Sequence, residues 1–167
     1  METQDIGYVA LSFDDATKKK VSGWLQQHLH PSDVVTATIS GKKKGGVVTQ
    51  KLHLTLFYGL NERLVDAQTL SGIMGSATLQ TVQAVRVGVF PVERFGCSAL
   101  YLEVADDTGT LRALHDRLSE LPHFPEYQQE FHPHVTLAYV CQDIDVKAFP
   151  DDFPKSLAVA EIVHIKK

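Results

Sequence analysis

A short motif occurs twice in the sequence, and this repeat limits the possible folds more than any other feature. Residues 53–58 read HLTLFY and residues 134–139 read HVTLAY, so the copies share His, Thr, Leu and Tyr at the same offsets. The copies lie half a chain apart in a sequence of 167 residues. This arrangement predicts one domain built from two similar lobes, because a solenoid needs at least three short repeats.

The sequence around the two copies predicts a similar order of elements in each half: strand, helix, motif strand, helix or irregular piece, strand. Runs of β-branched and aromatic residues predict strands, and apolar residues at helical spacing predict helices. No linker divides the elements, so we expect a single bilobal domain over residues 1–167. The predicted strands are 6–13, 34–40, 52–58, 81–90, 99–104, 135–140 and 157–165, and the predicted helices run from about 14 to 30, 62 to 74 and 108 to 121.

Strand geometry predicts where the repeated polar residues point. Side chains alternate across a strand, so residues two apart share a face. His53 and Thr55 therefore point to one side, as do His134 and Thr136, and the intervening apolar residues point into a core. If a pseudo-twofold axis relates the lobes, both polar pairs face one cleft that holds two imidazoles and two hydroxyls.

Nearby aromatic residues are candidates for holding a nucleobase. By strand parity Phe57 shares the face of His53 and could stack on a base, whereas Tyr58 and Tyr139 fall on the opposite face. Phe131 is a candidate because it closely precedes the second motif. Packing in the core or in the wall of the cleft is the alternative role for these side chains.

Two imidazoles and two hydroxyls suit phosphodiester chemistry without a metal. A neutral imidazole takes a proton from the attacking oxygen, an imidazolium protonates the leaving oxygen, and each hydroxyl donates to a phosphate oxygen. His132-Pro133-His134 and His28-Leu29-His30 also offer His-x-His pairs that could bind a metal. Both pairs lack a carboxylate or thiolate partner at ligand spacing, so we predict no metal and no cofactor.

The motifs resemble those of a known superfamily. Residues 52–56 (LHLTL) and 132–137 (HPHVTL) are similar to the two signatures of the two-histidine (2H) phosphoesterases, which include the enzymes called 2′-5′ RNA ligases and the cyclic phosphodiesterases. The resemblance implies an α+β fold with two pseudo-symmetric lobes of antiparallel-rich sheet and flanking helices around a central cleft. It also implies that His53 and His134 are the catalytic pair and that Thr55 and Thr136 bind the phosphate.

Charge and composition narrow the class of partner. Sixteen basic and twenty acidic residues give a net charge of −4, which argues against a protein that binds long nucleic acid through many phosphates. The segment 41–46 (GKKKGG) predicts a mobile hairpin tip or flap that could meet an anionic ligand. We expect a short RNA end or a small nucleotide as partner, no membrane span, reduced cysteines, and a monomeric protein in the cytosol.

The expected function is a metal-independent phosphodiesterase for 2′,3′-cyclic phosphate RNA ends, 2′-5′ linkages or related small cyclic nucleotides. This substrate class follows from the resemblance, whereas the residues alone indicate paired acid–base chemistry at a phosphate. The resemblance also implies that His134 deprotonates water and His53 protonates the leaving oxygen. Three alternatives stay open: a nucleotide or RNA-end binding module without turnover, a viral-type nuclease for cyclic oligonucleotide signals, and a metal-dependent hydrolase.

Overall fold

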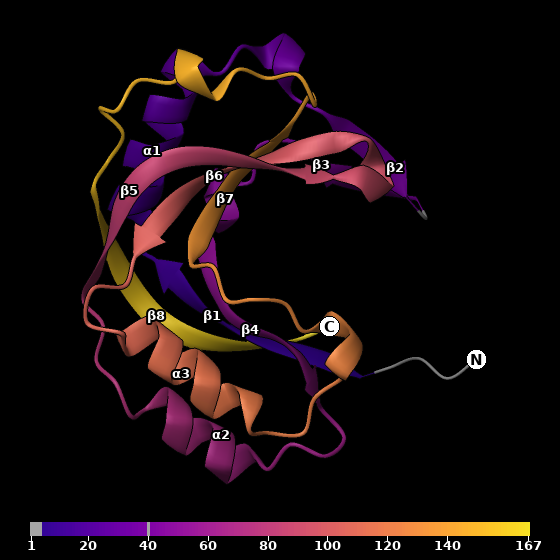
Figure 1. Ribbon diagram of the computed structural model, residues 1–167, viewed down its shortest axis with the longest axis vertical. Coiled ribbons are helices and arrows are strands. Elements are labelled where there is room, and N and C mark those ends of the chain that lie inside the picture. The colour runs from indigo at the N-terminus through magenta and orange to yellow at the C-terminus, as the bar shows by residue number, and fades with distance from the viewer. Residues whose placement is uncertain (1–4, 40) are drawn as a thin grey trace.

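A strongly curved, six-stranded antiparallel sheet dominates the computed structural model, which describes residues 5–39 and 41–167. Figure 1 shows the sheet as a C-shaped profile with the helices outside the curve. The strands are β1 (Ile6–Phe13), β2 (Thr36–Ile39), β3 (Lys42–Gly45), β4 (His53–Asn61), β5 (Thr81–Val92), β6 (Cys97–Ala105), β7 (His134–Val140) and β8 (Ser156–Lys166), and the helices are α1 (Asp15–His28), α2 (Ala67–Met74) and α3 (Thr110–Ser119).

The strand order β4-β1-β8-β5-β6-β7 divides the sheet into two related halves. β1 pairs with the motif strand β4, and β6 pairs in the same way with the motif strand β7. The third strand of each half comes from the other half of the sequence, since β8 pairs with β1 and β5 pairs with β6. The predicted α+β fold with two pseudo-symmetric, antiparallel lobes is confirmed.

The two motif strands form opposite edges of the sheet and are not neighbours in it. They nevertheless approach each other, with Cα atoms of β4 and β7 within 8 Å, because the sheet curves back on itself. Sequence reasoning placed the strands side by side. The structure reaches the same juxtaposition through the curvature of the whole sheet, since antiparallel strands twist and their edges can converge.

A β-bulge interrupts each motif strand at the same place. In β4, Val9 of β1 pairs with Phe57 and the next residue, Ala10, pairs with Thr55, so Leu56 is an extra residue. Leu137 is the extra residue in β7. Each bulge reverses the alternation of side chains that follows it.

The bulge in β4 corrects the predicted orientation of two aromatic residues. Phe57 is only 2% exposed and belongs to the hydrophobic core, whereas Tyr58 is half-buried on the same face as His53. The parity prediction is wrong here because it assumed an unbroken strand. Tyr139 likewise joins the face of His134 after the bulge in β7.

Capping residues determine where helices α1 and α2 begin. The Asp14 side chain accepts a hydrogen bond from the Thr17 amide at 2.8 Å and starts α1 where the sequence predicted. α2 begins at Ala67, later than the predicted start near residue 62, because Asp66 caps it by accepting from the Thr69 amide at 2.9 Å. Within residues 5–39 and 41–167, no helix is long and apolar enough to cross a membrane.

The hairpin of β2 and β3 contains the lysine-rich segment and confirms the predicted hairpin. Tyr139 of β7 holds its base, since the Val35 amide donates to the Tyr139 carbonyl and the Tyr139 amide donates to the Gly46 carbonyl, both at 2.9 Å. The side chains of Lys42 and Lys43 lie outside the described part of the structure. The predicted mobility of the hairpin stays a prediction.

Truncation of a core residue behind the second motif should destabilise the fold. Leu137 is fully buried, so Leu137→Ala should lower the free energy of unfolding by about 2–5 kcal/mol in denaturant titrations. Leu64→Ala is the control, because Leu64 is 66% exposed and its truncation should cost within about 0.5 kcal/mol. Equal losses in both variants would contradict this assignment of the core.

Candidate functional site

Both motif histidines are held by the same contact. The Nδ1 atom of His53 lies 2.9 Å from the Lys51 carbonyl oxygen, and Nδ1 of His134 lies 2.6 Å from the His132 carbonyl oxygen. A carbonyl oxygen only accepts, so each Nδ1 carries a hydrogen and donates it. Each neutral imidazole therefore keeps Nε2 as a proton acceptor, and each protonated imidazole can donate from Nε2.

A cavity of about 420 Å³ lies on the concave face of the sheet and receives residues from both lobes. Thr55 and Tyr58 line it from β4, His134 lines it from β7, and Phe131 lines it from the loop before β7. His53 and Thr136 are not among its lining residues. The charge of His53 is nevertheless close enough to lower the pKa of His134, so the two imidazoles share one electrostatic environment.

His134 lies in a largely aromatic environment. Its ring contacts Tyr101 at 5.4 Å and Phe90 at 5.6 Å between centroids. Burial lowers the pKa of His134, and the charges of His132 and His53 lower it further against the opposing hydrogen bond to the His132 carbonyl. The neutral form of His134 is therefore favoured near neutral pH, whereas His53 is exposed to solvent.

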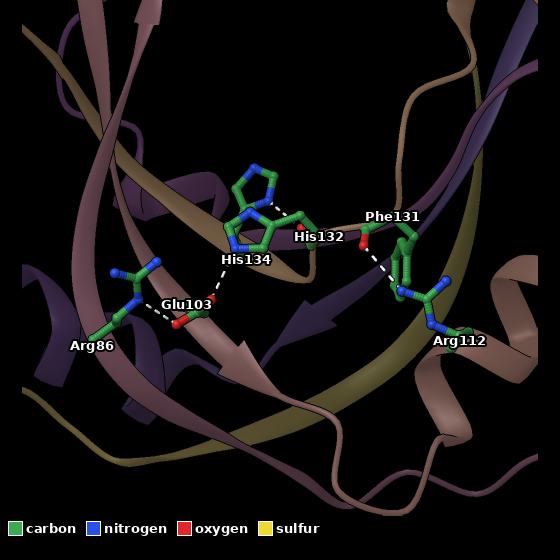
Figure 2. Close-up of polar contacts among 6 residues, drawn as sticks. All are labelled: Arg86, Glu103, Arg112, Phe131, His132 and His134. Carbon is green, nitrogen blue, oxygen red and sulfur yellow. Dashed lines mark hydrogen bonds and ion pairs between the residues drawn. The ribbon is translucent and has the colours of Figure 1, made fainter.

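A charged network supports the second motif (Figure 2). The Arg86 guanidinium donates to Glu103, and the other carboxylate oxygen of Glu103 lies 3.0 Å from Nε2 of His132. Hydrogen bonds from Arg86 and then from His132 hold the pKa of the Glu103 carboxyl below its usual range. The His132 ring stacks on the His134 ring at 5.6 Å, so the network ends at the candidate catalytic imidazole.

This network breaks the symmetry of the two motifs. Glu103 is the residue opposite His134 in the β6–β7 pair, whereas the uncharged Ser12 is opposite His53 in the β1–β4 pair. Sequence reasoning missed Arg86 and Glu103. One signal was available, since Glu103 is a lone carboxylate in the otherwise apolar run ALYLEV.

Phe131 and Phe57 both pack against helix α3. The Phe131 ring stacks on His115 at 4.5 Å, and the Arg112 guanidinium lies 5.7 Å from the Phe131 ring and donates to its carbonyl (Figure 2). Phe57 contacts the same His115 at 5.5 Å. A ring that is 2% exposed cannot stack on a base, so Phe57 supports the cavity from behind.

Tyrosines take the position that sequence reasoning gave to Phe57. Tyr58 lines the cavity, and its ring lies 5.6 Å from Tyr8, which in turn lies 6.3 Å from the His53 ring. Sequence reasoning placed Tyr58 on the wrong face and missed Tyr8, Phe90 and Tyr101, because the orientation of these rings depends on strand pairing and on the bulges. An alternating strand pattern alone does not decide which face of the sheet these rings occupy.

The two His-x-His pairs have other partners. His132 contacts Glu103, and Nδ1 of His30 accepts from the Ser32 amide at 3.1 Å. Nε2 of His28 lies 3.8 Å from the Asp152 carboxylate. Among the residues that the structure describes, no three His, Cys, Asp or Glu side chains gather as a potential metal site.

A comparison with protein families finds a match over most of the chain. The 2′-5′ RNA ligase superfamily matches residues 29–166 of the chain. None of the curated proteins matches the sequence.

Solved structures with a similar fold include a phosphoesterase and LigT of Escherichia coli. The phosphoesterase has 20% identity and a TM-score of 0.60 over 98% of this chain and 88% of its own. LigT complexed with ATP has 21% identity and a TM-score of 0.59 over 99% and 88%, and LigT complexed with 3′-AMP has 18% and 0.57 over 98% and 88%. At these identities the likeness shows the fold.

Removing the charge of His132 should raise the pKa of His134. Burial holds that pKa below the ordinary imidazole value, and the His132 charge contributes in the same direction, so His132→Gln should move it upward. NMR titration of the His134 Cε1 proton measures the change. His30→Gln, in the segment after α1, is the control and should leave the His134 titration in place. A His134 pKa at or above the ordinary imidazole value in the wild-type protein would contradict the buried environment described above.

Proposed function

Because the chain belongs to the 2′-5′ RNA ligase superfamily of two-histidine phosphoesterases, we propose that it is a metal-independent phosphodiesterase. Its substrates are 2′,3′-cyclic phosphate RNA ends, 2′-5′ linkages or related small cyclic nucleotides. The observation that carries the proposal is the repeated anchoring of His53 and His134 through Nδ1 to a carbonyl two residues upstream. This contact presents two Nε2 atoms for acid–base work on one substrate.

In the proposed reaction on a 2′,3′-cyclic phosphate, Nε2 of neutral His134 removes a proton from the attacking water. The new bond joins the water oxygen to phosphorus as the bond from phosphorus to the 3′ oxygen breaks. Protonated His53 gives its Nε2 proton to that 3′ oxygen, which leaves a 2′-phosphate. The lowered pKa of His134 supports its role as the base.

The remaining site residues bind and orient the substrate. Thr55 and Thr136 donate hydroxyl hydrogen bonds to the non-bridging phosphate oxygens, which carry more charge in the transition state. Tyr58 and Phe131, which line the cavity, contact the nucleoside. In this proposal Tyr58 replaces Phe57 as an aromatic contact, and the protein acts as a cytosolic monomer on short RNA ends or small nucleotides.

Alanine at either histidine should abolish most of the activity. His53→Ala or His134→Ala should lower kcat for a nucleoside 2′,3′-cyclic phosphate by about 10² to 10⁴, because each removes a general acid or base. His30→Ala is the matched control and should retain full activity with an unchanged melting temperature. Turnover in a His53→Ala/His134→Ala double variant at the wild-type rate would falsify the proposal, and tight nucleotide binding without turnover in the wild type would identify a binding module.

A substrate with an activated leaving group separates the two roles. Such a leaving group needs no acid, so His53→Ala should recover much of its lost rate, whereas His134→Ala should not. Stopped-flow release of a chromogenic alcohol measures both rates. The reverse pattern would exchange the roles of the two histidines and leave the pair intact.

The pH dependence of kcat/KM should be bell-shaped. As pH falls, protonation of His134 removes the base, and this acidic limb should lie below the ordinary imidazole pKa of about 6.5 because burial lowers the pKa of His134. As pH rises, the acid loses its proton and the rate falls again. EDTA should leave the rate unchanged. Activity that rises steadily with pH and disappears on chelation indicates a metal-bound hydroxide instead.

A further inference from the structure

A second cavity, of about 630 Å³, opens between the β2–β3 hairpin, the turn before β6 and the end of β8. Figure 1 shows these segments on the two arms of the curved sheet. Three cationic side chains line the cavity: Lys44, Arg94 and Lys167. Among its lining residues in the described part of the chain there is no Asp or Glu side chain. This concentration of positive charge stands out in a protein of net charge −4.

Two of these cations come from tight backbone turns that border the cavity. Gly45 has φ +87°, and a Cβ atom there would lie 2.7 Å from the Val35 carbonyl oxygen, so the base of the hairpin closes without strain only with glycine at this position. Lys44 is the preceding residue. Arg94 lies in the short turn Glu93–Phe95, where its guanidinium is 4.6 Å from the Phe95 ring.

Neither Lys44 nor Arg94 has a carboxylate within 4 Å in the part of the chain that the structure describes. Arginine and lysine recognise phosphate through charge-assisted hydrogen bonds, and arginine can do so with two parallel donors. Cations that converge on a cavity whose lining holds no Asp or Glu attract a phosphate group.

Contacts to both motif strands relate the cationic cavity to the cavity beside His134. Tyr139 lines the cationic cavity and lies on the same face of β7 as Thr136. On the other arm, the Lys167 ammonium lies 5.1 Å from the ring of Tyr58, which lines the catalytic cavity. Three residues of strand, from Thr136 to Tyr139, span about 10 Å. The next phosphate of a nucleotide chain bound at the histidines would therefore lie toward the cationic cavity.

We propose that Lys44, Arg94 and Lys167 form a subsite for a second phosphate of the substrate, the 5′ phosphate of the nucleoside that carries the scissile phosphate. This inference rests on the proposed function. It makes the preferred substrate an RNA end, or another nucleotide with a further phosphate, and makes an unphosphorylated cyclic mononucleotide a poorer substrate.

Two matched pairs of nucleotides test the subsite. A nucleoside 2′,3′-cyclic phosphate with and without a 5′-phosphate gives the ratio of kcat/KM values, and a nucleoside 2′-phosphate with and without a 5′-phosphate gives the ratio of dissociation constants by calorimetry. In the wild-type protein the 5′-phosphate should improve both values about tenfold or more, as expected for charge-assisted contacts. A dinucleotide ending in a cyclic phosphate should show the same gain, because its internal phosphate occupies the same place.

Arg94→Ala and Lys44→Ala should each reduce, several-fold, the improvement that the 5′-phosphate brings to kcat/KM and to the dissociation constant. Both side chains are exposed, and circular dichroism checks that each variant folds. Lys19→Ala is the control, because it removes the same charge from the exposed surface of α1 and should keep the full gain.

The two measurements separate failure of the subsite from failure of the proposed activity. Hydrolysis of both cyclic substrates with equal kcat/KM values overturns the subsite and keeps the phosphodiesterase. Binding that improves with the 5′-phosphate and depends on Arg94, without turnover, supports the subsite and overturns the phosphodiesterase. A gain that survives in both Arg94→Ala and Lys44→Ala, or equal losses in Lys19→Ala, also overturns the subsite.

Discussion

The paired bulges at Leu56 and Leu137 determine how the core and the cleft are related. Each bulge places two consecutive side chains in the core and returns the following tyrosine to the face of the motif histidine. Each bulge residue also has its carbonyl oxygen bound by a group from outside the sheet, since His115 Nδ1 lies 2.7 Å from the Leu56 oxygen and the Val48 amide donates to the Leu137 oxygen at 2.9 Å. Helix α3 and the segment after β3 are therefore attached at equivalent points of the two lobes.

The two lobes have similar structures, but the two motif histidines have different surroundings. Both histidines donate through Nδ1 to a carbonyl, but His134 is packed against Phe90 and Tyr101 and lies beside the network of Arg86, Glu103 and His132. Burial and neighbouring positive charge disfavour protonation of His134, whereas His53 faces solvent. Two similar motifs can thereby supply a base and an acid, which a reaction with simultaneous proton removal and donation requires.

Much of the fold could be predicted from local patterns. The strands around residues 6–13 and 99–104 and the helix along Leu111, Leu114 and Leu118 follow from β propensity and helical spacing, and the structure contains them with small shifts at their ends. The start of α2 was predicted too early because apolar residues at helical spacing begin before Asp66, the residue that caps the helix. Capping is a specific hydrogen bond, and it decided a boundary that periodicity left open.

The sequence by itself determined the order of elements, the twofold repeat and the identity of the candidate catalytic histidines, since these depend on residue type and short-range spacing. Only the tertiary structure decided which aromatic rings face the cleft, which histidine is buried, and that Glu103 and Arg86 support it. A bulge shifts every later side chain to the other face, and the pairing of β6 with β5 and β7 joins residues far apart in sequence. Burial and long-range charge depend on those pairings, so no local pattern encodes them.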